Sequence, residues 1–94
     1  MVEMDAHLTW IKGGVARVVS LGPDAIVLRS TVPSPPGSRI DGVLAGSHAA
    51  GVRIKIHASR RQSDGEFLLE GRPLDLRRET RERLQAMVRG AGTG

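Results

Sequence analysis

The sequence predicts a mainly β domain, a small antiparallel barrel or sandwich of six short strands with one C-terminal α-helix. Its apolar residues are mostly Val, Leu, Ile and Ala, with one Trp, one Phe and no Tyr, and β-branched aliphatic side chains favour strands. The 12 glycines and 5 prolines indicate many turns. A chain of 94 residues is long enough for one domain and too short for two.

Glycine, proline and aspartate divide the chain into the expected strands. Paired glycines and Ser-Asp-Gly sequences are typical of hairpin turns, whereas a segment with three prolines cannot pair in a sheet. On these signals the expected turns and loops are 13–14, 22–24, 33–37, 46–51 and 63–65. The expected strands are 8–12, 15–21, 25–31, 39–45, 51–59 and 66–71.

The fifth expected strand has the clearest alternation in the chain. Its apolar side chains are predicted to face inward and its polar ones outward. The inward set is Val52, Ile54, Ile56 and Ala58, and the outward set is Arg53, Lys55, His57 and Ser59. In the fourth strand the alternation is imperfect, so we expect Ile40 and Val43 inward and a bulge at Gly42.

After Pro73 the apolar spacing changes from that of a strand to that of a helix. Asp75 is the expected N-cap, because its carboxylate can accept a backbone N–H at the start of a helix. One helical face then carries Leu76, Thr80, Leu84, Met87 and Val88. Gly90 is expected to end the helix. The predicted single domain spans 1–94, with a core at about 8–89 and a flexible tail at 90–94. A lone amphipathic helix needs a sheet to cover, which favours a helix packed over one opening or edge of the strands.

No motif in the sequence indicates enzyme chemistry. There is no cysteine, no phosphate-binding glycine loop and no nucleophile elbow. The three histidines, His7, His48 and His57, lack the close spacing of metal ligands. We therefore expect no catalytic residue, no metal and no cofactor. No apolar run is long enough to span a bilayer, and residues 1–5 do not resemble a secretory signal, so the expected location is cytoplasmic.

The feature with most functional potential is basic. The net charge is +4, and 12 of the 14 cationic residues are arginine. Arg53 and Lys55 share one strand face, and Arg60 and Arg61 stand at the end of that strand. Such a patch can hold a phosphate or a carboxylate, although a solvated strand face gives the same pattern. With Trp10 and Phe67 as the only aromatic residues, the stacking surfaces typical of single-strand nucleic-acid binders are scarce.

The order of these elements resembles the PilZ family, whose members bind the bacterial second messenger cyclic di-GMP. The resemblance covers about 8–88, and its best segments are 18–28, 36–40, 51–56, 67–74 and 81–84 in the helix. It implies a six-stranded antiparallel PilZ-like barrel with a C-terminal helix. It also implies a role in bacterial cyclic di-GMP signalling.

The family's two ligand motifs are degenerate in this chain. One is Arg-x-x-x-Arg before the barrel, but no arginine precedes Gly13, and Arg77 and Arg81 have this spacing only within the expected helix. The other is Asp or Asn, x, Ser, x, x, Gly at the turn between strands two and three. Its three signature positions are occupied by Ser20, Gly22 and Ala25.

Three hypotheses follow. The first is a PilZ-like adaptor that acts through an unidentified protein partner, on the surface bearing Arg53 and Lys55 or on the outer face of the helix. The second is a cyclic di-GMP receptor with replacement arginines, for which Arg17, Arg60 and Arg61 are the candidates. The third, less favoured, is a small nucleic-acid-binding barrel.

Overall fold

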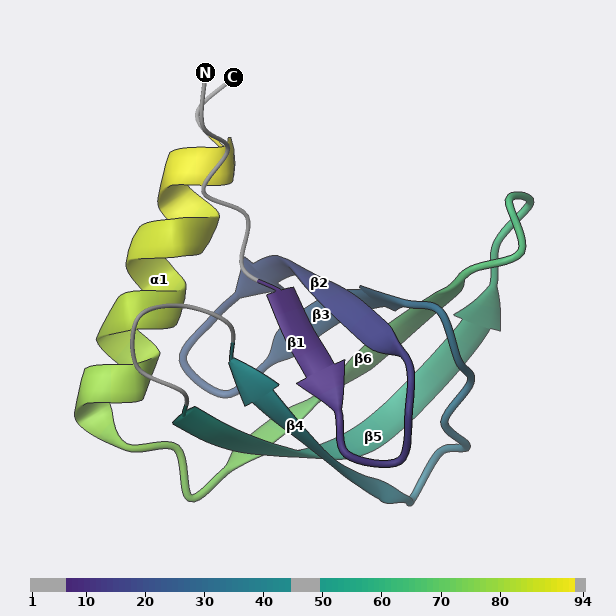
Figure 1. The fold of residues 1–94 in the computed structure, drawn as a ribbon, viewed down its shortest axis with the longest axis horizontal. Helices are drawn as coiled ribbons and strands as arrows, with labels where there is room; N and C mark the ends of the chain where they lie inside the picture. The colour runs from purple at the N-terminus through teal and green to yellow at the C-terminus, as the bar shows by residue number, and fades with distance from the viewer. Residues whose placement is uncertain (1–6, 45–49, 93–94) are drawn as a thin grey trace.

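The computed structural model describes residues 7–44 and 50–92. Within these ranges the chain forms six strands followed by one helix (Figure 1). The elements are β1 (His7–Trp10), β2 (Val15–Leu21), β3 (Ile26–Ser30), β4 (Arg39–Leu44), β5 (Ala50–Arg61), β6 (Phe67–Leu74) and α1 (Arg78–Gly92). The mainly β class and the C-terminal helix are confirmed.

The strands close into a barrel rather than a sandwich. Their order around the barrel is β1-β2-β3-β6-β5-β4, and every neighbouring pair is antiparallel. The first and fourth strands complete the ring, with Leu8 opposite Leu44. Because β5 and β6 are long, their hairpin projects from the barrel on the side away from α1 (Figure 1). Closure leaves few unpaired strand edges for chance association.

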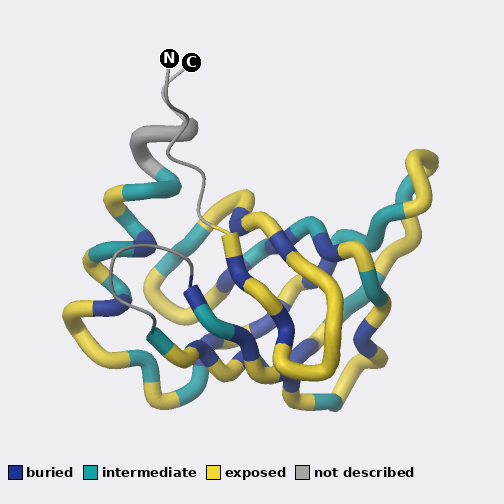
Figure 2. The backbone as a smooth tube through the Cα atoms, viewed as in Figure 1, coloured by how far each residue is buried: buried dark blue, intermediate teal, exposed yellow. Residues whose placement is uncertain are grey.

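The core fills the barrel interior with aliphatic side chains and one tryptophan. Along the strands, buried and exposed stretches of the backbone alternate (Figure 2). Trp10 is 2% exposed, and its Nε1–H donates to the hydroxyl of Ser30 at 2.9 Å. That hydroxyl in turn donates to the carbonyl of Val32 at 2.7 Å. Both buried polar groups therefore have partners, as burial of an indole or a hydroxyl requires.

Gly42 is not a bulge, which corrects the prediction for the fourth strand. The pairing of β4 with both neighbours is regular, with Gly42 opposite Val52 on one side and Trp10 on the other. Ile40, Gly42 and Leu44 face inward, so Val43 lies on the outer face. The glycine is needed because a Cβ there would lie 2.8 Å from the Trp10 ring.

Two real register shifts occur elsewhere, in β2 between Val18 and Ser20 and in β5 between Ile56 and Ala58. The second changes the faces that the alternation predicted. Beyond it, Ala58 pairs with Glu70 on the outer side instead of continuing the buried row. A β-bulge adds one residue to a strand and so reverses the side on which later residues point.

The helix packs on the barrel through the face that its spacing predicted. Thr80 and Leu84 are buried, and Leu76, Met87 and Val88 pack against the core cluster. In Figure 1, α1 runs along one flank of the barrel, and it contacts β2. Helix α1 is too short and too polar to cross a bilayer, and it is the only helix in the described part of the chain.

Both predicted helix ends are wrong by a few residues. Asp75 does not cap the helix, because its backbone is left-handed with a φ of 51°. The helix begins at Arg78. The carbonyl of Arg77, just before it, accepts a hydrogen bond from the backbone N–H of Arg81. At the other end the helix continues past Gly90 to Gly92, and residues 93–94 lie outside the described part.

The last strand is longer than predicted, because it continues through Pro73 to Leu74. Its ladder with β3 stops at Gly71, whereas its ladder with β5 continues to Leu74. Pro73 therefore lies where β6 is paired on one side only, a position at which a missing N–H is tolerated. Most of the predicted loop at 46–51 lies outside the described residues, as does His48.

Candidate functional site

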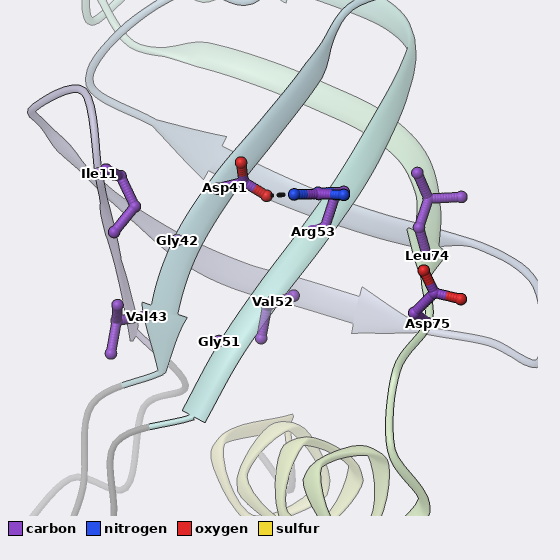
Figure 3. Close-up of a pocket in the computed structure, with 9 residues that line it drawn as sticks. All are labelled: Ile11, Asp41, Gly42, Val43, Gly51, Val52, Arg53, Leu74 and Asp75. Atoms are coloured by element: carbon purple, nitrogen blue, oxygen red, sulfur yellow. Dashed lines mark hydrogen bonds and ion pairs between the residues drawn. The ribbon is translucent and has the colours of Figure 1, made fainter.

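A groove opens on the outer surface of the barrel where β4, β5 and the end of β6 meet the β1–β2 turn (Figure 3). We call it the outer groove; its volume is about 360 Å³. It is lined by Ile11, Asp41, Gly42, Val43, Gly51, Val52, Arg53, Leu74 and Asp75. Ile11 at its rim is 70% exposed. An open hollow with apolar walls and a few charges is typical of a binding surface.

The charges of the outer groove centre on Arg53. Its Nε–H donates to Asp41 Oδ1 at 2.8 Å from the neighbouring strand, and the two residues are register partners (Figure 3). This hydrogen bond, together with the negative charges of Asp41 and Asp75, raises the pKa of Arg53 above its ordinary value. Both members of the pair are about half exposed, so the pair adds little to stability. Its main effect is to orient two charges across the floor of the groove.

The predicted partner surface, Arg53 and Lys55, lies on one face as expected, and the structure adds two arginines to it. Lys55 is directly opposite Arg39 on β4 and Arg72 on β6. We call Arg39, Lys55 and Arg72 the cationic row. Sequence alternation places each of them on an outer face, but only the strand order shows that they are neighbours.

The three candidate replacement arginines are not gathered into one site. Arg17 on β2 pairs with Arg29 on β3, and Arg60 on β5 pairs with Leu68 on β6. Strands β3 and β6 thus separate Arg17 from Arg60, a distance of about 14 Å across three strand spacings. Arg61 is one residue along from Arg60 and therefore points to the opposite face of its strand.

The space between these arginines is occupied by an ion-pair cluster. Arg29 donates to Asp64 at 2.5 Å and to Glu66 at 3.2 Å. The pKa of Asp64 is lowered, first by the backbone N–H of Glu66, which donates to its Oδ1 at 3.0 Å, and further by the charge of Arg29. Arg17 lines only a small hollow of about 100 Å³, well below the roughly 300–1,000 Å³ of ligand pockets.

The turn between β2 and β3 contains the three degenerate motif positions. Ser20 and Ala25 are exposed, and Gly22 N donates to the carbonyl of Ala25 at 2.8 Å to close the turn. The carbonyl of Gly22 accepts from Arg81 Nη1 at 3.2 Å, which ties the turn to α1. Ser20, Gly22 and Ala25 together present one hydroxyl and no carboxylate or amide side chain.

The outer face of the helix, the alternative partner surface, carries charges of both signs. Arg78, Glu79 and Glu82 are exposed there. Among the side chains of α1 that the structure describes, those of 78–88, no large apolar one is exposed. Mixed charges of this kind are typical of a solvated helix face. The outer groove, which combines apolar and charged groups, is therefore the stronger candidate.

Comparison of the chain with family models, curated proteins and solved structures finds no match. The structure itself defines the class: a closed six-stranded antiparallel barrel with one C-terminal helix and an open groove on its outer face.

Proposed function

We propose that this protein is a PilZ-like bacterial signalling module that acts as a protein-interaction adaptor and has lost cyclic di-GMP binding of the family's usual kind. The observation that carries the proposal is the contrast between two surfaces. At the β2–β3 turn, the motif positions Ser20, Gly22 and Ala25 present a ligand with only one side-chain hydroxyl. Arg81 already donates a hydrogen bond to the carbonyl of Gly22 in this turn. The outer groove, by contrast, is open, partly apolar and charged.

The chemistry of cyclic di-GMP supports this reading. Its two phosphates and two guanines call for forked arginine donors held close together. Arg17 and Arg60 are separated by two intervening strands, and Arg29 between them is engaged by two carboxylates. A receptor that uses Arg17, Arg60 and Arg61 would have to rearrange these side chains and break that cluster.

The outer groove has the composition of a protein interface. Interfaces combine an apolar centre with a polar rim, and a few anchoring side chains carry most of the affinity. Ile11, Val43 and Leu74 supply apolar contact area, and Asp41 with Arg53 supplies oriented polar groups. A partner side chain that fills the groove would bury Ile11, which is now exposed.

Calorimetric titration with cyclic di-GMP tests the proposal. The purified protein is expected to give no saturable heat at low micromolar ligand, and saturable binding of one or two ligands would overturn the loss of binding. In that case Arg60→Ala combined with Arg61→Ala should weaken binding by more than about tenfold, because the double variant removes the charge-assisted phosphate contacts that the replacement-arginine hypothesis assigns to this pair. Unchanged binding in this variant would refute the replacement-arginine hypothesis.

A further inference from the structure

The cationic row places three positively charged residues side by side on the barrel surface. Arg39, Lys55 and Arg72 occupy directly opposed positions on three adjacent strands. Directly opposed side chains have Cβ atoms about 4.5–5.5 Å apart, so the Cβ atoms of the three cationic residues lie within about 10 Å of one another. Arg39 and Arg72 are exposed, whereas Lys55 is half buried between them.

This arrangement costs stability, and the described part of the chain does not neutralise it. Like charges directly opposite one another destabilise a sheet. The ion pairs of the described residues involve Arg29 and Arg53, and none involves the cationic row. Glu70 lies two residues from Arg72 on the same outer face, but no ion pair joins them. A surface that concentrates unneutralised positive charge is suited to an anionic partner.

The cationic row is continuous with the outer groove. Asp41, Arg53 and Leu74, which line the groove, are register partners and lie two residues along their strands from Arg39, Lys55 and Arg72. Two residues of strand span about 7 Å. One bound segment can therefore contact the row with charged side chains and the groove with an apolar one.

We propose that the partner docks through an acidic segment, with its carboxylates on the cationic row and an adjacent apolar side chain in the outer groove. The inference rests on the proposed adaptor function and names the chemistry of the partner. A nucleic acid fits this surface less well. Trp10 is buried and Phe67 is half buried, so the described surface offers no exposed aromatic side chain on which a base could stack. The outer groove also offers apolar area with which a phosphate backbone makes no favourable contact.

Fluorescence anisotropy with a defined probe tests the proposal. The probe is a labelled synthetic peptide of three glutamates followed by two leucines, flanked by glycines, and its binding to the wild-type protein at low salt should be saturable. Neutralising the cationic row should weaken binding by at least about tenfold, because each carboxylate loses a charged partner. The row variant is Arg39→Gln, Lys55→Gln, Arg72→Gln.

A control variant removes the same amount of charge from exposed positions elsewhere. It is Arg17→Gln, Arg60→Gln, Arg78→Gln, on β2, β5 and α1. The control should weaken binding by less than about twofold. Equal losses in the two variants, or no saturable binding to the wild type, would overturn the proposal. So would tighter binding of a labelled oligothymidylate of the same charge, which would favour a nucleic acid.

A single substitution separates binding from folding. Lys55→Glu puts a carboxylate between Arg39 and Arg72, where cross-strand ion pairs replace repulsion. The variant should melt no lower than the wild type and should bind the peptide at least about tenfold more weakly. Retained peptide binding would refute the inference. The cyclic di-GMP titration is independent of the peptide experiments. If cyclic di-GMP does not bind and the peptide predictions also fail, the proposed adaptor function stands and only the acidic partner is rejected.

Discussion

Adding one methyl group at Gly42 should strongly destabilise the barrel. A Cβ at this position would lie 2.8 Å and 3.0 Å from Cε3 and Cζ3 of Trp10, and 3.2 Å from the carbonyl oxygen of Thr9. The Trp10 ring is fully enclosed and is held by its hydrogen bond to Ser30. It cannot move away without disturbing the core and that bond.

The size of the effect follows from these contacts. Overpacking a dense core costs about 1–3 kcal/mol, and a strained or lost hydrogen bond to the indole adds about 1 kcal/mol. The free energy of unfolding should therefore fall by about 2–4 kcal/mol, from a total of about 5–15 kcal/mol for a domain of ordinary stability. For a domain of this size the melting temperature should fall by about 8–30 °C.

Gly51→Ala is the matched control. Gly51 lies on the neighbouring strand β5 and also lines the outer groove, but a Cβ there meets no atom within 4 Å. Its free energy of unfolding should change by no more than about 0.5 kcal/mol. Denaturant unfolding followed by the fluorescence of Trp10, the only tryptophan, measures both variants. Equal midpoints for Gly42→Ala and Gly51→Ala would refute the packing argument.

Two further predictions concern the core hydrogen bond and the acid side of the stability curve. Ser30→Ala leaves the buried Nε1–H of Trp10 without its acceptor, so the free energy of unfolding should fall by about 1–3 kcal/mol. A denaturant unfolding midpoint equal to that of the wild type would show that this hydrogen bond is dispensable. The pKa of Asp64 is lowered in the folded protein, so its contribution to stability is present above its ordinary pKa of about 3.8 and is lost as the pH falls through the lower folded value. Asp64→Asn should therefore flatten the fall in denaturation midpoint below about pH 4, and an unchanged pH dependence would contradict the role of this carboxylate.

Much of the fold was predictable because its signals are local. Alternation of apolar and polar residues marked β5, and the glycine pair 13–14 marked the first hairpin, whose two glycines both have positive φ. The role of Gly42 was not predictable, since it depends on a ring packed from β1. The register shift after Ile56 was also missed, because a bulge depends on the pairing of two strands and leaves little trace in one.

The candidate site, like the fold, was predictable only where its signals are local. Arg53 and Lys55 could be assigned to one outer face from their spacing alone. Arg39 and Arg72 join them only through the strand order β4-β5-β6, which spacing does not reveal. Conversely, Arg17 and the pair at 60–61 are equivalent candidates in the sequence, but the barrel places β3 and β6 between them.

The loss of cyclic di-GMP binding is tested most simply by calorimetric titration of the wild-type protein with cyclic di-GMP. We expect heats no larger than those of dilution at low micromolar ligand, because the β2–β3 turn forms no prepared site and Arg17, Arg60 and Arg61 are not gathered into one. A saturable isotherm with one or two ligands bound per chain would contradict it and would make the protein a receptor for cyclic di-GMP.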